Sequence, residues 1–293
     1  MTRVSMNVEP MPPEGDVATA RQPPELEALR ADHFAKARSP RVYDCLLGGI
    51  ETYQPDRDAA LDLYQAAPWA PLAARTNRYF TQTATAAVLR RGIAQFLDLG
   101  CGLPHSPDLH RLVPHGSPVV YVDRDPGVLA HAKTRLDIGP PYATDVVAAD
   151  LLDMETLLAH PDIAGAFDLG GPIAVSVHDV LPWNLDDAAV ADAMEALRDW
   201  LPVGSTLSVT HLTDHFNPRT VPRAVAAYER HGILVRPRSP AQVSALFGGF
   251  DHLGCGLAAV SQWSAHGPTV RHFTPYPARA EDCAAFAGIA VKS

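Results

Sequence analysis

Short apolar segments alternate with helix-like segments through the middle of the chain. We expect strands at residues 95–100, 118–123, 145–150, 172–179 and 205–212. We expect helices at residues 106–113, 125–136 and 186–201. In the last of these, Val190, Met194 and Leu197 recur at helical spacing. Strands that are apolar along nearly their whole length, each followed by a helix, predict an α/β fold with a parallel sheet covered on both faces.

Capping residues predict where several helices begin. Ser106 and Asp125 each precede a proline, a pair typical of a helix N-cap and first helical position. Nearer the N-terminus, residues 55–67 read as a helix with an acidic first turn. Thr76 is expected to cap a further helix that stops at Gly92.

The C-terminal part breaks the alternation. A helix over 239–250 is followed by strands within 250–263 and 285–293, with no helix after the last one. This order predicts an antiparallel pair at the edge of the sheet. The expected organisation is a disordered tail over 1–24, a helical N-terminal cover over 25–92 and one α/β domain over 93–293.

Composition restricts the partners and the compartment. The 293 residues carry 24 Lys and Arg against 33 Asp and Glu, a formal net charge of −9. Nucleic acids and anionic membranes select clustered basic residues, so neither is expected as a partner. The N-terminus has no apolar signal region, and no stretch reaches the roughly 18 apolar residues of a membrane span. Cys45, Cys101, Cys255 and Cys283 form no CxxC pair, which favours reduced thiols in a cytoplasm.

The stretch FLDLGCGLP, residues 96–104, joins the first predicted strand to the next helix. Gly100 and Gly102 would let the backbone approach a ligand closely. Alone, this pattern suits a dinucleotide, a nucleoside or a tight turn without a ligand.

Acidic residues at the ends of the second and third strands favour a ligand that contains a nucleoside. Asp123 ends the second strand, 21 residues after Gly102, where a carboxylate can accept hydrogen bonds from both ribose hydroxyls; Arg124 follows it. Asp150 ends the third strand, where its side chain and the next N–H, of Leu151, can meet an adenine edge.

The loop itself argues against a dinucleotide. His105 stands where the dinucleotide fingerprint has its third glycine. Asp98 would repel a pyrophosphate but attract the α-amino group of a methionine moiety. The residues therefore favour S-adenosylmethionine over NAD.

These features resemble the class I, Rossmann-like S-adenosylmethionine-dependent methyltransferases. Further stretches resemble one actinobacterial group, the S-adenosyl methyltransferase family, formerly a domain of unknown function. They are SPRVYDCLLGGIETYQPDRDAA (39–60), NRYF (77–80), QFLDLGCGLP (95–104), VVYVDRDPGVLAHA (119–132) and ALFGGFDHLGCGL (245–257) with Trp263. The resemblance covers about residues 36–293 and implies a seven-stranded sheet whose last strand is antiparallel. Members often carry Thr where this chain has His105.

Two histidines are candidate general bases. His178, followed by Asp179, ends the fourth strand, and His211 ends the fifth. His178 can equally pack against the cofactor or line the pocket. A metal site from His211, Asp214 and His215 is an alternative, but such short spacing in a loop is typical of solvated residues, so no metal is expected.

The reactive-looking Cys101 is not expected to act as a nucleophile. Class I methyl transfer is a direct displacement that needs alignment and no covalent enzyme intermediate, so Cys101 reads as a small filler between the glycines. Five aromatic residues can line an acceptor pocket, although most are expected in the core: Trp183, Phe216, Tyr228, Phe247 and Trp263.

The stretch RSPRVYDCLLGG, residues 38–49, is predicted to form a lid over the cofactor together with Asn77. Tyr43 would contact the cofactor, and Arg78 or Arg41 would meet its carboxylate. Gly48 and Gly49 would let the backbone turn. The alternative is a structural clasp that touches no ligand.

The predicted function is methylation of an O, N or C atom of a small molecule, with S-adenosylhomocysteine as product. Three alternatives stay open: S-adenosylmethionine chemistry without methyl transfer (cyclisation or aminocarboxypropyl transfer), a non-catalytic sensor of the cofactor, and an NAD-dependent oxidoreductase. The sequence leaves room for a homodimer.

Overall fold

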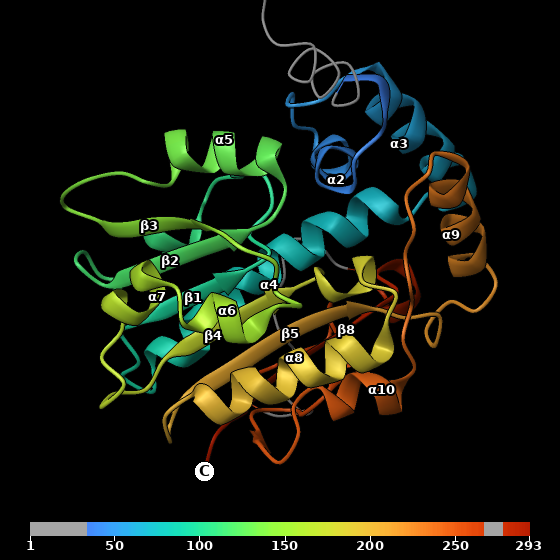
Figure 1. Ribbon diagram of the computed structural model, residues 1–293. Coiled ribbons are helices and arrows are strands. Elements are labelled where there is room, and N and C mark those ends of the chain that lie inside the picture. The colour runs from blue at the N-terminus through green and yellow to red at the C-terminus, as the bar shows by residue number, and fades with distance from the viewer. Residues whose placement is uncertain (1–33, 267–277) are drawn as a thin grey trace, which may run out of the picture. The chain divides into compact units, whose positions relative to one another are not determined.

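A mixed β-sheet runs through the structure (Figure 1). The computed structural model describes residues 34–266 and 278–293, and Lys36–Ser293 form one unit. Within these residues the strand order is β3-β2-β1-β4-β5-β8-β6, with β7 also paired to β8. The strands are β1 (Phe96–Leu99), β2 (Pro118–Asp123), β3 (Ala143–Ala148), β4 (Ala174–His178), β5 (Thr206–Leu212), β6 (Asp251–His252), β7 (Ala258–Ala259) and β8 (Ala285–Val291).

Strands β1 to β5 are parallel, and β8 is antiparallel to each of its neighbours. The predicted fold class is therefore confirmed, with one correction: the described sheet has eight strands instead of seven. The strand expected within 250–263 is split into β6 and β7. Between them the N–H of Cys255 donates to the carbonyl of Ser264 instead of to β8, and Gly254 and Gly256 adopt positive φ.

Helices cover both faces of the sheet, as predicted. In Figure 1, α6, α7 and α8 lie on the viewer's side, and α4 lies behind the sheet. Two apolar clusters fill these layers, one around α8 and one around α4 and α5. The helices are α2 (Ser39–Leu47), α3 (Gln54–Ala66), α4 (Ala70–Leu89), α5 (Pro126–Arg135), α6 (Met154–Leu158), α7 (Pro161–Ala166), α8 (Asp187–Trp200), α9 (Val221–Arg230) and α10 (Pro240–Ala245). Three short 3₁₀ turns are η1 (Leu109–Arg111), η2 (Leu181–Trp183) and η3 (Ala280–Asp282).

Of the three residues predicted to cap a helix N-terminus, one is confirmed and two are wrong. Asp125 caps α5 by accepting the N–H groups of Gly127 and Val128 at 2.7 and 3.2 Å. Ser106 caps nothing, because residues 106–113 contain only η1. Thr76 lies inside α4, where its hydroxyl donates to the carbonyl of Leu72 at 2.8 Å.

The failure at Ser106 has a local cause. The carboxylate of Asp108 accepts the N–H of His105 at 2.9 Å and so closes the loop. The chain makes only a single 3₁₀ turn after it. No helix N-terminus therefore follows the glycine loop.

A third apolar cluster joins α2, α3 and the start of α4 to α9. Beside it, the fully buried carboxylate of Asp56 accepts the N–H groups of Arg38 and Tyr53 at 2.9 and 2.8 Å. The same carboxylate pairs with Nε of Arg41 at 2.8 Å, tying α3 to α2. The expected tail over 1–24 lies outside the described residues.

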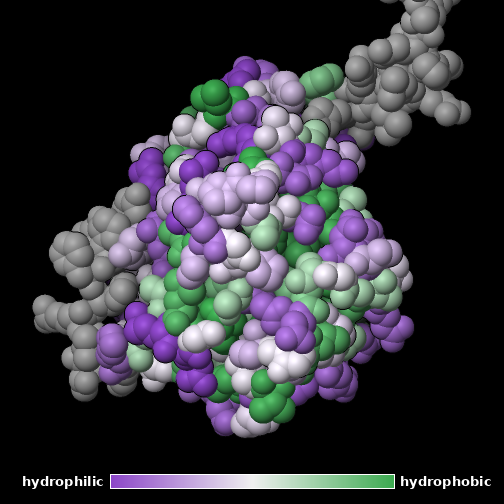
Figure 2. All heavy atoms as spheres, turned by 90° about the vertical axis from the view of Figure 1, so that its left-hand side faces the viewer, coloured by the Kyte–Doolittle hydropathy of each residue, from purple (hydrophilic) through white to green (hydrophobic). Residues whose placement is uncertain are grey.

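Hydrophilic and hydrophobic residues are interspersed on the protein surface. On the face in Figure 2, hydrophilic residues surround small groups of hydrophobic ones, as on an ordinary water-exposed surface. Among residues 34–266 and 278–293, no helix combines the length and apolar character needed to cross a membrane.

Replacing Asp56 by Ala should lower the free energy of unfolding by about 3–5 kcal/mol, because it leaves the Arg41 charge buried without this partner. Urea unfolding followed by circular dichroism measures the change. The control is Asp58→Ala on the exposed side of the same helix, where we expect less than about 0.5 kcal/mol. Equal effects of the two substitutions would contradict this role for Asp56.

Candidate functional site

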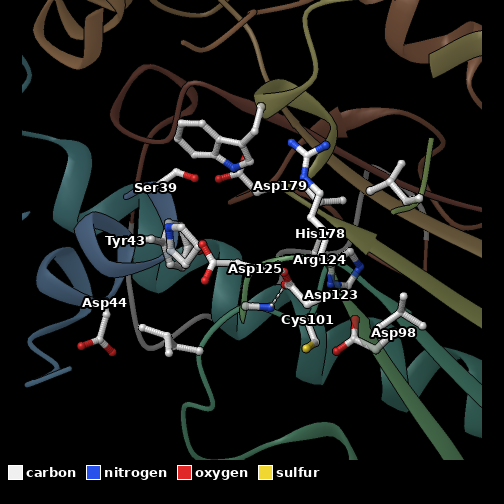
Figure 3. A pocket seen from close by; sticks show the side chains of 18 of the residues that line it. Ser39, Tyr43, Asp44, Asp98, Cys101, Asp123, Arg124, Asp125, His178 and Asp179 are labelled. Carbon is white, nitrogen blue, oxygen red and sulfur yellow. Dashed lines mark hydrogen bonds between the residues drawn. The ribbon is translucent and has the colours of Figure 1, made fainter. Parts of the chain in front are cut away.

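A cavity of about 410 Å³ lies at the carboxyl ends of β1, β2 and β4, with α2 and α4 forming further walls (Figure 3). This volume is in the range of small-molecule sites. Parallel α/β sheets bind ligands at this edge.

Nine of the ten positions predicted from the sequence to bind a cofactor line this cavity. They are Tyr43, Arg78, Asp98, Gly100, Gly102, Asp123, Arg124, Leu151 and His178. The tenth, Asp150, lies beyond the end of β3, which stops at Ala148. Its carboxylate turns to Arg124, at 2.8 Å in a pair exposed to solvent, and accepts the N–H of Leu152.

The glycine loop is held by the neighbouring strand. The N–H groups of Gly100 and Cys101 both donate to the carbonyl of Val122, at 2.8 and 3.0 Å. Gly100 has φ +71°, and a Cβ added there would overlap the side chain of Val180. The position therefore requires glycine for its backbone angle and for the approach of Val180.

Asp123 links the loop to the strand end. One carboxylate oxygen accepts the N–H of Gly102 at 3.0 Å, and the other accepts the N–H of Asp125 at 2.9 Å. The carboxylate thus faces the cavity while it fixes the position of Gly102 (Figure 3).

Asp98 and Arg78 bring opposite charges to the same part of the cavity. In β1, Leu97 and Leu99 join the core on the α8 side, so Asp98, which alternates with them, points toward α4, which carries Arg78. Burial raises the pKa of Asp98 to about 7, against the lowering effect of Arg78. The Asp98 carboxyl accepts no hydrogen bond from the residues that the structure describes.

The guanidinium of Arg78 is fixed by its own partners. It donates to the carbonyl of His105 at 2.6 Å and lies 3.8 Å from the carboxylate of Asp108. The α4 helix thereby places a cation beside the glycine loop.

Helix α2 supplies the opposite wall of the cavity. The hydroxyl of Tyr43 donates to the carbonyl of Ala74 and accepts from the amide of Asn77, at 3.2 and 2.9 Å. The same amide accepts the hydroxyl of Thr210 at 2.6 Å, which joins α2, α4 and β5 in one chain of hydrogen bonds.

The two glycines after α2 do not line the cavity. Gly48 ends the helix with φ +85°, and a Cβ on Gly49 would overlap the carboxylate of Asp44. Arg41 also lies away from the cavity, because it is buried against Asp56. Of the two arginines considered for a ligand carboxylate, only Arg78 has a suitable position.

The two candidate bases differ in position. His178 lines the cavity, with its ring nitrogens 3.1 Å from the hydroxyl of Thr81 and 2.8 Å from that of Ser208. Burial, and secondarily Arg78, lowers its pKa to about 3. At neutral pH His178 is an uncharged ring and a weak base.

The position of His211 does not support its prediction as a base. It is fully buried and absent from the cavity lining. Its Nδ1–H donates to the carbonyl of Leu212 at 2.7 Å, and its Nε2 accepts from Arg238 at 2.9 Å. Burial lowers its pKa to about 4. Within the described residues, no group of three or more His, Cys, Asp or Glu side chains is arranged to hold a metal ion.

The remaining predictions concern a thiol and the aromatic residues. Burial raises the pKa of the Cys101 thiol, which fits an inert filler better than a nucleophile.

Among the five aromatic candidates only Trp183 lines the cavity. Three further lining residues, Ser39, Pro40 and Leu47, lie in the stretch 38–49 that was predicted to form a lid. Sequence reasoning did not single out Asn184, the residue after η2, because a lone polar residue there carries no periodic signal.

Replacing Gly100 by Ala should lower the free energy of unfolding by about 2–4 kcal/mol, from left-handed backbone strain and overlap with Val180. Adding Val180→Ala should recover part of this loss, because the overlap disappears while the strain remains. Denaturant unfolding of the single and double variants measures the coupling. Gly139→Ala is the control, since nothing lies within 4 Å of its added Cβ; strictly additive effects would contradict the contact.

Comparison with known proteins identifies the family. Residues 27–293 match the family model described as S-adenosyl methyltransferase. A crystal structure of a DUF574-family protein from Streptomyces avermitilis is similar, with 32% identity and a TM-score of 0.81, covering 89% of this chain and 99% of that one.

A second crystal structure is similar over nearly the whole chain. It is a candidate methyltransferase from Thermobifida fusca, with 31% identity and a TM-score of 0.78, covering 94% of this chain and 99% of that one. No curated protein matches the chain. These similarities confirm the resemblance that the sequence motifs indicated. The chain belongs to the S-adenosyl methyltransferase family, an enzyme family whose cofactor is S-adenosylmethionine.

Proposed function

We propose that the protein transfers the methyl group of S-adenosylmethionine to an O, N or C atom of a small molecule. The observation that carries the proposal is the pair Arg78 and Asp98 beside the glycine loop. An arginine and an acidic group at one place complement the carboxylate and ammonium of an amino acid. A methionine moiety has both.

The other parts of the cavity suit an adenosine. Asp123, which lines the cavity, would accept hydrogen bonds from the ribose hydroxyls, and the N–H of Leu151 would meet the adenine edge. The exposed pair of Asp150 and Arg124 would lie beside the adenine. The α2 wall, through Tyr43, would cover the cofactor as a lid. The hydrogen bonds from Tyr43 to α4 support a pre-formed wall, which serves a lid and a structural clasp alike.

The cofactor supplies an electrophilic methyl carbon on a sulfonium, so the protein's task is placement and exclusion of water. Asp98 and Arg78 would fix the methionine end, and Asp123 the ribose. Because His178 is uncharged and hydrogen-bonded through both nitrogens, it orients neighbouring groups better than it removes a proton.

Two alternatives of different chemistry are separable by product analysis. Methyl transfer leaves S-adenosylhomocysteine, whereas cyclisation or aminocarboxypropyl transfer leaves methylthioadenosine. A sensor would bind the cofactor without turnover across a broad acceptor panel. NAD is disfavoured here, since the glycine loop leads into η1 and Asp98 would repel a pyrophosphate.

The setting we propose is an actinobacterial cytoplasm, with no nucleic-acid or membrane partner and room for a homodimer. All four cysteines are free thiols, which supports a reducing compartment.

Replacing Asp123 by Ala should weaken binding of S-adenosylhomocysteine by about 100-fold, from the loss of charge-assisted hydrogen bonds to two hydroxyls. Isothermal titration calorimetry measures the change. Asp153→Ala, exposed on the surface beyond β3, should leave affinity unchanged. Unchanged affinity in the Asp123→Ala variant would contradict the proposal that Asp123 binds the ribose hydroxyls.

Binding of S-adenosylhomocysteine should weaken as the pH falls through 7. The raised pKa of Asp98 means that its carboxyl gains a proton there and loses its attraction for the ligand's ammonium, at a rate approaching tenfold per pH unit. Calorimetry from pH 8 to pH 5.5 tests this. In Asp98→Asn the affinity should be lower at pH 8 and nearly independent of pH below 7. A pH dependence that persists in that variant would reject the assignment.

A further inference from the structure

Asp179 directly follows β4, has an unusual backbone conformation and lines the cavity. Its φ of +55° is left-handed, although it is not a glycine. Its N–H donates to the carbonyl of Thr210 at 3.1 Å, which holds the backbone in place. Among the described residues its carboxyl has neither a hydrogen-bond donor nor a cation as partner. A strained backbone that presents an unpaired acid to a cavity is typical of a functional position.

The position of Asp179 separates it from the cofactor groups. Going along the sheet from β3, the strands follow as β2, β1, β4 and β5. The proposed adenine and ribose contacts lie at β3 and β2, and the methionine contacts at β1. Asp179 follows β4, one strand further. In Figure 3, Asp179 and Ser39 lie at one end of the cavity, and Asp98 and Cys101 at the other.

Other proton acceptors near this end are occupied. Both ring nitrogens of His178 have hydroxyl partners. The hydroxyl of Tyr43 is engaged with α4, and burial raises its pKa. Among the residues that the structure describes, Asp179 is the acid on this side whose carboxyl has no partner.

The cavity that Asp179 lines also has apolar lining residues. They include Pro40 and Leu47 of α2 and Trp183 of η2. The indole of Trp183 is held edge-on to Tyr228, with ring centroids 5.3 Å apart. Such walls suit a small molecule with an apolar or aromatic body.

We propose that Asp179 is the group that accepts the proton of the methyl acceptor, and that the acceptor's reacting atom is therefore a nitrogen or oxygen bearing hydrogen, on an apolar or aromatic body. This inference rests on the proposed methyl transfer and names its substrate class. The acceptor's lone pair forms the new bond to carbon, the electron pair of the breaking C–S bond stays on sulfur, and the N–H or O–H proton passes to the Asp179 carboxylate. Carbon acceptors are thereby disfavoured.

The raised pKa of the Asp179 carboxyl fits its role as proton acceptor. Burial raises the pKa of Asp179 to about 7, so near neutral pH it is a stronger base than an ordinary carboxylate. A hydrogen bond from the acceptor would also satisfy the unpaired carboxyl, which favours ligands that donate one.

The test uses the full chain saturated with S-adenosylhomocysteine and two matched pairs of probes. Phenol and aniline carry a donor, while anisole and N,N-dimethylaniline lack it. We expect phenol or aniline to bind about tenfold more tightly than its methylated partner, as measured by ligand-observed NMR, and to shift the Asp179 signal of protein with ¹³C-labelled Asp carboxyls. Preference for phenol or for aniline tells which element is methylated.

Three variants complete the experiment. Asp179→Ala should abolish the tenfold preference. Asp179→Asn, which still accepts a hydrogen bond but is a poor base, should retain part of it and lose turnover of the preferred probe with S-adenosylmethionine. Asp192→Asn, exposed on α8, is the control and should behave like the parent protein.

The outcomes separate this inference from the proposed function. All four proteins should bind S-adenosylhomocysteine, and failure of the parent to do so would reject the proposed function. If the cofactor product binds but the donors show no preference, bind equally to Asp179→Ala, or do not bind at all, the role of Asp179 is rejected and the methyl-transfer proposal stands.

Discussion

The carbonyl of Val122 holds the loop on which the whole site depends. It accepts two N–H groups, those of Gly100 and Cys101, and thereby turns the chain sharply as it leaves β1. This contact is available because Leu99 pairs with Val122 in the parallel register of β1 and β2. The next residue on β2, Asp123, then meets the N–H of Gly102. Sheet register thus fixes both the loop and the carboxylate that faces it.

Features governed by neighbouring residues were predictable from the sequence. Asp125 caps α5 through N–H groups two and three residues away. The parallel strands followed from apolar runs, although β3 ends at Ala148 and not at Asp150 as predicted. Thr76 and Ser106 failed because each has the residue type of a cap but a different local partner. Thr76 bonds back to Leu72 within a helix that already begins at Ala70, and Asp108 closes the loop around Ser106 by accepting the N–H of His105.

Contacts between segments far apart in the sequence could not be predicted from local sequence patterns. Tyr43 and Asn77 were both suspected near the cofactor, but the hydrogen bond between Asn77 and Thr210 links residues 133 positions apart. Arg41 looked as suitable as Arg78 until the fold paired it with Asp56. A charge in the sequence does not say whether it will face a cavity or neutralise a buried partner, because that depends on how helices pack. Asp179 likewise had no distinctive spacing, and only its backbone angle and missing partner set it apart.

Two unpaired acids at opposite ends of one cavity have a common electrostatic consequence. Burial raises the pKa of both Asp98 and Asp179 to about 7, in the case of Asp98 against the lowering effect of Arg78, so each carboxyl is partly protonated near neutral pH. A positive charge brought into the cavity would lower both pKa values and favour the carboxylates. Asp98 would respond to the ammonium of the methionine moiety and Asp179 to the sulfonium. Asp179 would therefore become a base mainly when the cofactor is bound, and it would carry the transferred proton once the positive charge on sulfur has gone.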